Sequence, residues 1–231
     1  MSLVGTGAVA IWHDIAPEGR DDFYAWHGEE HMPERADIPG FIRGRRYVAT
    51  RAGLEFFNLY ETSSPEVLKG SDYLSRLNSP TPWTTATVKH FRNVARSLCR
   101  VEYTSSHGEG GLIATLRYDV PQASAVDHLT HMKNVILPSL SRQPGIAGLH
   151  LLVADVGASA IRTEEQKHRA EANRIPAWVL LVEGWGDERP FEAWSDATLS
   201  ANFWSEAGAT GPADIGFYRL QNVRTAVSRE P

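Results

Sequence analysis

The first predicted helix carries histidines and glutamates whose spacing suits proton transfer. Side chains three or four residues apart on a helix lie on neighbouring positions of one face. Five side chains between residues 21 and 35 share such a face: Phe23, His27, Glu30, His31 and Glu34. A carboxylate beside a histidine fixes the tautomer and holds the imidazole pKa near neutrality. We therefore predict that His27 pairs with Glu30 as a general base, with His31 in the same catalytic site.

Two alternatives use the same helix. In the structural one, His27 and His31 pack where helix meets sheet and cap backbone groups near Pro33, which cannot continue a helix comfortably. In the metal alternative, the H-G-E-E-H segment matches the H-x-x-E-H pattern of inverzincin metallopeptidases, which bind zinc through two histidines. Zinc needs a third protein ligand, and Glu102 or Glu109 would have to supply it. Because the proline fits a peptidase helix poorly, we expect no metal site.

The strands that must position this helix occur twice. The segment Gly7–Pro17 aligns without a gap on Gly111–Pro121, a shift of 121 − 17 = 104 residues. A later strand, Phe56–Glu61, has its counterpart in Trp178–Glu183, a shift of 183 − 61 = 122 residues. Both pairs have the short apolar pattern of strands, and the first pair is closed by proline. The sequence therefore predicts an internal repeat.

The second copy is longer than the first. The Pro-Gly turns at 39–40 and 144–145 are 145 − 40 = 105 residues apart, so 122 − 105 leaves about 17 extra residues. They fall near 157–174, where Glu165 and Arg169 lie at helical spacing among other charged residues. We expect this insertion to be a solvated excursion.

Each copy has the order strand, helix, strand, strand, helix, strand. That order gives a ferredoxin-like unit, a four-stranded antiparallel sheet with both helices on one face. The bare apolar face needs a partner, since soluble monomers rarely expose so large a patch. We predict an α+β protein in which residues 1–106 and 111–231 form two ferredoxin-like repeats. Their sheets should pack face to face as an α+β barrel.

The duplicated order resembles the dimeric α+β barrel superfamily. The motifs that carry the resemblance are Trp26–Pro33, late in the first helix, and the following Pro39–Phe41 turn. The resemblance covers nearly the whole chain as topology and lies nearest to the EthD-like branch. It implies relatives that include cofactor-free monooxygenases, lactone isomerases, polyketide cyclases and haem-dependent enzymes, so the reaction must be argued from the site.

Polar groups set among aromatic rings are the candidate ligand-binding residues. At the 104-residue shift, His13 falls on Arg117 and His27 on His131, so one histidine position recurs. One face of the first strand should look into the barrel. The predicted ligand-binding residues are His13, Tyr60, Trp83, Tyr118, His131 and Trp185. They suit a flat aromatic or polyketide-like molecule, and the alternative is a tryptophan-rich core.

Three functions fit these residues. The first is a cofactor-independent cyclase, isomerase or monooxygenase in which a histidine deprotonates an aromatic or enolisable substrate, and it predicts a closed pocket beside His27. The second is a binding protein that holds a small hydrophobic or aromatic molecule without transforming it. The third is haem chemistry, with His27, His131 or His150 as axial ligand. We expect the first, with no cofactor.

Composition excludes several other classes. A net charge of −5 and a pI near 6.0 argue against a nucleic-acid partner. The single cysteine, Cys99, excludes an internal disulfide and is expected to be inert core. No apolar run approaches the roughly 20 residues needed to span a bilayer. We expect a cytoplasmic protein with no membrane partner, and whether it forms a homodimer stays open.

Overall fold

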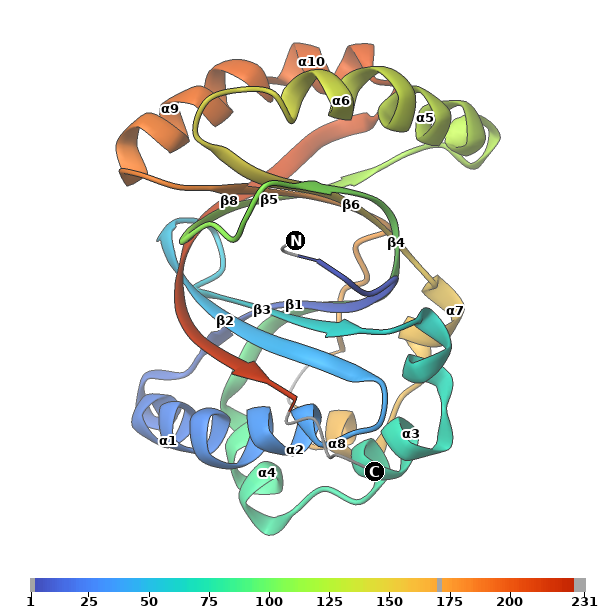
Figure 1. Ribbon diagram of the computed structural model, residues 1–231. Helices are drawn as coiled ribbons and strands as arrows, with labels where there is room; N and C mark the ends of the chain where they lie inside the picture. The colour runs from blue at the N-terminus through green and yellow to red at the C-terminus, as the bar shows by residue number, and fades with distance from the viewer. Residues whose placement is uncertain (1–2, 170–171, 227–231) are drawn as a thin grey trace.

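The protein is a closed antiparallel barrel of eight strands (Figure 1). The computed structural model describes residues 3–169 and 172–226. The strands are β1 (Gly7–Ile15), β2 (Phe41–Arg51), β3 (Phe56–Thr62), β4 (Phe91–Ser106), β5 (Leu112–Asp119), β6 (Ile146–Ala154), β7 (Trp178–Gly184) and β8 (Thr210–Thr225). Their order around the barrel is β1-β3-β2-β8-β5-β7-β6-β4. The predicted fold class, two tandem ferredoxin-like repeats packed as an α+β barrel, is confirmed.

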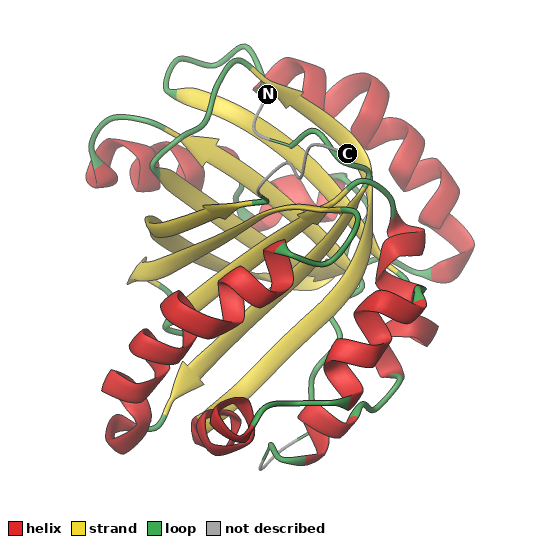
Figure 2. Ribbon diagram, turned by 60° about the horizontal axis from the view of Figure 1, so that its bottom comes forward, coloured by secondary structure: helices red, strands yellow, loops and turns green. Residues whose placement is uncertain are grey.

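Helices cover the outer faces of the barrel (Figures 1 and 2). Those of the first copy are α1 (Arg20–Trp26), α2 (Met32–Ala36), α3 (Ser71–Asn78) and α4 (Pro82–Thr87). Those of the second are α5 (Ala125–His131), α6 (Leu137–Leu140), α9 (Glu188–Thr198) and α10 (Ala201–Glu206), and the insertion forms α7 (Val156–Ala160) and α8 (Glu164–Lys167). Short helical turns complete the layers: η1 (Pro17–Gly19), η2 (His27–His31), η3 (Pro65–Lys69), η4 (Val88–His90), η5 (Gln122–Ser124) and η6 (Met132–Ile136). Within the described residues no helix is long and apolar enough to cross a membrane.

Two strand pairs close the barrel within one chain. The strand β2 of the first copy pairs with β8 of the second, and β4 pairs with β6. Both β4 and β8 are 16 residues long, so each can pair along one part with its own copy and along another with the other copy. Closure removes the free sheet edges that would otherwise pair with another chain.

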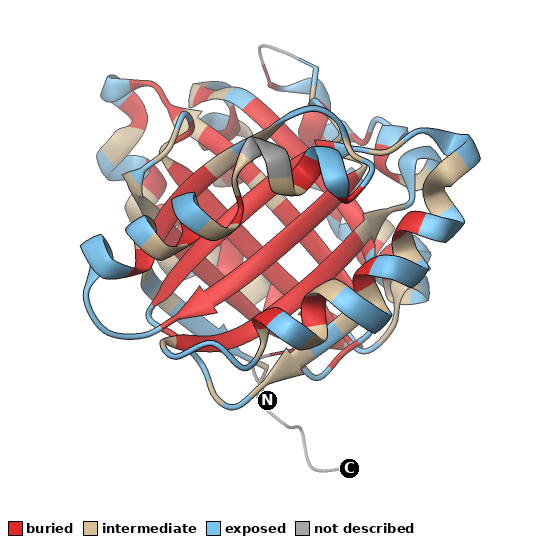
Figure 3. Ribbon diagram, turned by 90° about the horizontal axis from the view of Figure 1, so that it is seen from above, coloured by how far each residue is buried: buried red, intermediate tan, exposed pale blue. Residues whose placement is uncertain are grey.

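Side chains fill the inside of the barrel and form its core. Figure 3 shows that the strands are mostly buried. The interior cluster includes Trp12, Tyr47, Phe57, Leu152, Leu181 and Tyr218. A buried ion pair joins the two copies there, with Arg45 Nη1 2.8 Å from Glu183 Oε1. Burial raises the pKa of Glu183, but the hydrogen bond from His150 and the charge of Arg45 outweigh burial and lower that pKa to about 2.

The repeat register differs by one residue from the gapless alignment of the first strands. Trp12 pairs with Phe57 in the first copy, and Arg117 pairs with Val179 in the second. The partners are 179 − 57 = 122 residues apart, as predicted, but the first strands are 117 − 12 = 105 apart. The predicted shift of 104 residues is therefore wrong. With the corrected shift, His13 corresponds to Tyr118 and no longer to Arg117. Alternate residues of a strand face opposite sides, so a change of one residue also changes the predicted face.

The recurring histidine disappears with this correction. Helices α1 and α5 begin at Arg20 and Ala125, again 125 − 20 = 105 residues apart. His27 therefore corresponds to Met132, the first residue of the η6 turn. His131 corresponds to Trp26 and is exposed, so the predicted match of His27 with His131 is wrong.

The insertion packs on the first copy and is not a solvated excursion. Helix α8 lies against α3, and α7 lies against β4. Inside the insertion, Glu165, Gln166 and Arg169 are buried. The Ser159 hydroxyl accepts a hydrogen bond of 2.9 Å from the backbone N–H of Leu98. Charged residues at helical spacing suggested a solvated surface, but Glu165 forms an ion pair with Arg35 of the first copy.

Candidate functional site

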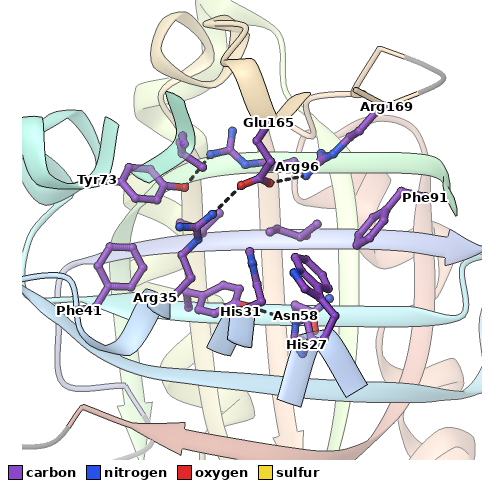
Figure 4. A pocket seen from close by; sticks show the side chains of 15 residues that line it. His27, His31, Arg35, Phe41, Asn58, Tyr73, Phe91, Arg96, Glu165 and Arg169 are labelled. Carbon is purple, nitrogen blue, oxygen red and sulfur yellow. Dashed lines mark hydrogen bonds and ion pairs between the residues drawn. The ribbon is translucent and has the colours of Figure 1, made fainter. Parts of the chain in front are cut away.

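A small, partly enclosed cavity lies between the helices and the sheet of the first copy (Figure 4). Its volume is about 30 Å³, and its lining comes from the strands β1 to β4, the first helix, α3 and the insertion. His27 lies in its wall. Pockets for drug-sized ligands have roughly 300–1,000 Å³. The cavity as it stands therefore admits only a group of a few atoms.

A π-helical turn brings His27 and His31 to this wall. The N–H of Met32 donates to the carbonyl of His27, five residues earlier. Pro33 explains this wider turn, because proline lacks an N–H and its ring clashes with the carbonyl four residues before it. The second copy repeats the arrangement, with the η6 turn followed by Pro138. The turn places the two imidazole centroids 5.4 Å apart.

His27 uses both of its ring nitrogens. Its Nδ1 lies 3.2 Å from Arg46 Nη1, and its Nε2 lies 3.0 Å from Tyr60 Oη. A guanidinium only donates, so Nδ1 is the acceptor and the neutral ring donates from Nε2 to Tyr60. Burial lowers the pKa of His27, followed by the charges of His31 and Arg46, which keeps the ring neutral. His27 therefore holds Tyr60 and has no free lone pair for proton abstraction.

The predicted pair of His27 with Glu30 is wrong. The Glu30 carboxylate accepts hydrogen bonds of 2.6 Å from Thr81 Oγ1 and 3.1 Å from Thr84 Oγ1. Thr81 is the N-cap residue of α4, so Glu30 ties the first helix to that neighbour. Helical spacing predicted adjacency on one face, but the π-helical turn changes the spacing and the threonine hydroxyls take the carboxylate.

Among His13, His27 and His31, it is His31 that has a ring nitrogen without a hydrogen-bond partner in the part of the chain that the structure describes. Its Nδ1 is buried and has no hydrogen-bond partner among the described residues. Its ring lies 4.3 Å, centroid to centroid, from that of Trp26. Burial lowers the pKa of His31, and the positive charges of Arg35 and Arg169 lower it further. At neutral pH the ring is therefore neutral and carries one lone pair.

An ion-pair cluster that the sequence analysis missed lies in the wall of the cavity. Glu165 Oε2 accepts from Arg35 Nη2 at 2.6 Å, and Glu165 Oε1 accepts from Arg169 Nη2 at 3.2 Å. Figure 4 shows both guanidinium groups reaching this one carboxylate. Arg96, which also lines the cavity, donates to Tyr73 Oη at 2.8 Å. The spacing of Glu165 and Arg169 was visible in the sequence, but nothing there linked them to Arg35.

Tyr60 lines the cavity, whereas His13 lies outside its lining and contacts two lining residues, Asn58 and Phe91. His13 Nε2 lies 2.9 Å from Asn58 Nδ2, and His13 Nδ1 lies 3.3 Å from the Asp14 carbonyl. Its ring packs 4.4 Å from that of Phe91, and burial lowers the pKa of His13 to about 3. The strand alternation places Trp12 in the barrel and His13 against the helices, which settles which face of the first strand looks into the barrel.

The other predicted ligand-binding residues lie elsewhere. Trp83 Nε1 donates to Asp22 on the outer surface. Tyr118 Oη lies 3.1 Å from His128 Nε2 in the second copy's helical layer, and His131 is exposed. Trp185 is 63% exposed in an open groove of about 790 Å³ on the second copy, a groove whose lining contains none of the histidines. These aromatics pack on different surfaces, so the predicted single aromatic-lined pocket is wrong.

The proposed metal and haem ligands do not assemble. Among the described residues no three histidine, cysteine or acidic side chains group to hold a metal ion. Glu102 lies near Arg100 and Lys133, and Glu109 pairs with Arg43. This contradicts the zinc alternative.

Haem fits the candidate histidines equally poorly. His27 has both nitrogens engaged and His131 is on the surface, while His150 Nδ1 lies 2.8 Å from Thr104 Oγ1 inside the barrel. The cavity of about 30 Å³ is also far smaller than a porphyrin. Cys99 is buried, and burial raises its pKa to about 12, so its thiol is inert core.

Comparison with solved structures identifies the fold. An anthrone oxidase-like protein superposes with a TM-score of 0.59 at 14% identity, covering 95% of this chain and 92% of that one. A candidate monooxygenase from Fusobacterium nucleatum gives 0.57 at 9% identity, covering 96% of both chains. One from Lactobacillus acidophilus gives 0.56 at 12%, covering 96% of this chain and 97% of that one.

The chain has the dimeric α+β barrel fold. No protein-family model matches the sequence, and neither does any curated protein sequence. At identities this low the likeness concerns the fold alone, so the reaction has to be argued from the cavity.

Proposed function

We propose that this protein is a cofactor-independent enzyme that deprotonates an enolisable or phenolic substrate at the first-copy cavity, with His31 as the base. One observation carries the proposal. The buried Nδ1 of His31 has no hydrogen-bond partner among the described residues, whereas the ring nitrogens of His13 and His27 are engaged. A neutral imidazole in a buried, desolvated site can accept a proton from carbon or oxygen.

The surrounding groups suit the charge that such a step creates. The substrate C–H or O–H bond breaks, the proton moves to His31, and the electron pair spreads onto a substrate oxygen. Arg35 and Arg169 lie at the same cavity and would stabilise that anion. His27 fixes the Tyr60 ring, and because it donates to the Tyr60 oxygen, the Tyr60 hydroxyl hydrogen remains for the substrate.

The likeness to monooxygenase and anthrone oxidase-like folds favours oxidation after deprotonation, with dioxygen as the oxidant. The W-H-G-E-E-H-M-P segment favours the EthD-like branch within this fold. A ring-sized substrate exceeds the present cavity volume of about 30 Å³. Since Glu165 and Arg169 form one wall, we propose that such a substrate enters when α8 and the residues up to Arg169, the α8 segment, move.

Hydrogen exchange tests the base directly. Anthrone or a cyclic 1,3-diketone is incubated with the protein in D₂O under nitrogen, and deuterium incorporation is followed by NMR. We expect the wild type to accelerate exchange and His31→Ala to lose about 100-fold or more, the usual contribution of a positioned base. The control is His131→Ala, because His131 is an exposed histidine on the second copy. Adding oxygen then measures whether oxidation follows.

Two results would refute parts of the proposal. Equal exchange by wild type and His31→Ala would show that His31 is not the base. Saturable binding of the ring compound without faster exchange would favour the alternative of a small-molecule binding protein over an enzyme.

A further inference from the structure

Positive charge is in excess around the first-copy cavity. Arg35, Arg96 and Arg169 line it, and Glu165 is the only carboxylate among its described lining residues. All four side chains are buried. With the histidines neutral, the lining carries a formal charge of 3 − 1 = +2. Unbalanced charge away from water is costly, so an anion in the cavity would stabilise the fold.

Glu34 is a further acid beside the cavity, and it balances only part of this charge. Its Oε2 lies 3.5 Å from Arg35 Nη1, and its Oε1 lies 3.8 Å from the exposed Arg76. Its side chain is 14% exposed, beside the cavity and outside its lining. Glu34 is thus shared between an inner and an outer arginine.

Two N–H groups of the cluster lack hydrogen-bond partners among the described residues. They are Nη1 of Arg35, which is within ion-pair range of Glu34 at 3.5 Å but makes no hydrogen bond, and Nε of Arg169, and both are buried. Their guanidinium groups come from α2 and from the insertion, and Figure 4 shows them meeting at Glu165. Buried donors are rarely left unsatisfied, and an unpaired one is a feature that a ligand can complete.

We propose that this cavity binds a small carboxylate between Arg35 and Arg169. Guanidinium groups bind carboxylates through short, charge-assisted hydrogen bonds, and Glu165 already occupies one side of both arginines. A cavity that holds one water needs roughly 10–15 Å³. The volume of about 30 Å³ exceeds this and suits a planar group the size of formate.

The carboxylate is either a free one- or two-carbon acid or the head of a larger molecule. In the second case the inference rests on the proposed function, because the carboxylate would then orient the acidic carbon of the substrate towards His31. The larger molecule would also have to displace the α8 segment. Formate and benzoate share the head group and differ in size, so together they separate the two sources.

The test measures formate binding to the full chain without any substrate. Binding is followed by line broadening of ¹³C-formate in NMR and by thermal unfolding. We expect saturable binding to the wild type and about tenfold or weaker affinity in Arg169→Gln, which loses a charge-assisted hydrogen bond. Glu165→Gln removes the competing carboxylate, so formate should bind more tightly and recover part of its thermal stability. Arg162→Gln, at an exposed arginine of the same insertion, should behave as wild type.

Several outcomes would overturn the proposal. The first is formate binding to the wild type that does not saturate. The second is an equal response to formate in wild type, Arg169→Gln and Arg162→Gln, because an equal response would be an ionic-strength effect. Should Arg169→Gln fail to fold, Glu165→Gln decides, because affinity equal to or weaker than wild type contradicts the proposal. Competition by benzoate supports the head of a larger molecule, and binding of formate alone supports a free acid. Because no turnover is measured, saturable formate binding with failed hydrogen exchange refutes only the catalytic function.

Discussion

Glu165 is a residue whose loss should damage the fold. It pairs with Arg35 at 2.6 Å and Arg169 at 3.2 Å, and all three side chains are at most 5% exposed. Replacing it by alanine leaves two buried guanidinium groups without their carboxylate. Breaking a buried ion pair costs about 3–5 kcal/mol. For a domain of this size each kcal/mol shifts Tm by about 2–4 °C, so Glu165→Ala should lower Tm by roughly 6–20 °C.

The neighbouring residue supplies the matched control. Glu164 pairs with Lys167 on the surface, and its side chain is 49% exposed. Exposed pairs contribute about 0–1 kcal/mol, so Glu164→Ala should change Tm by less than about 4 °C. Differential scanning calorimetry of both variants measures the contrast. Equal small shifts would refute the conclusion that the insertion is held on the first copy through Glu165.

Two further predictions follow from the buried polar groups. Burial lowers the pKa of three histidines in the folded protein: His13, to about 3, and His27 and His31. Below the unfolded pKa of about 6.5 they stay neutral in the folded protein but bind protons when it unfolds. The unfolding free energy in urea should therefore fall as pH drops from 6.5 towards 4, by up to about 1.4 kcal/mol per pH unit for each histidine, and a flat profile would contradict this. Glu30→Ala should lower stability by about 1–3 kcal/mol, because it leaves the threonine hydroxyls of α4 without their acceptor. In the exchange assay its pH profile should match that of wild type, whereas a shifted profile would restore Glu30 as a partner of the base.

Local sequence patterns were sufficient to predict the architecture of the barrel. Apolar strands closed by proline and the two Pro-Gly turns recur at nearly constant spacing. The order of elements then dictates a ferredoxin-like sheet, and a bare sheet face requires a partner. The same patterns placed His27 and His31 on a helix beside the sheet, where both now line the cavity.

The contents of the site depended on tertiary contacts. The gapless alignment was wrong by one residue, and strand faces alternate. It therefore matched His13, which faces the helices, with Arg117, which lies over Trp12 inside the barrel. Pro33 widened the helix into a π-helical turn, and Glu30 bonded to threonines of α4 instead of to His27. The insertion lay far from Arg35 in sequence, with Glu165 130 residues away, yet their charges pair across the two copies.

The chain by itself therefore determined the duplicated α+β barrel and the helix that carries its histidines, since both follow from short-range periodicity and connectivity. Only the tertiary structure decided which histidine keeps a free nitrogen and that arginines surround it. Hydrogen-bond competition and charge pairing act between residues distant in sequence, so local spacing holds no information about their outcome.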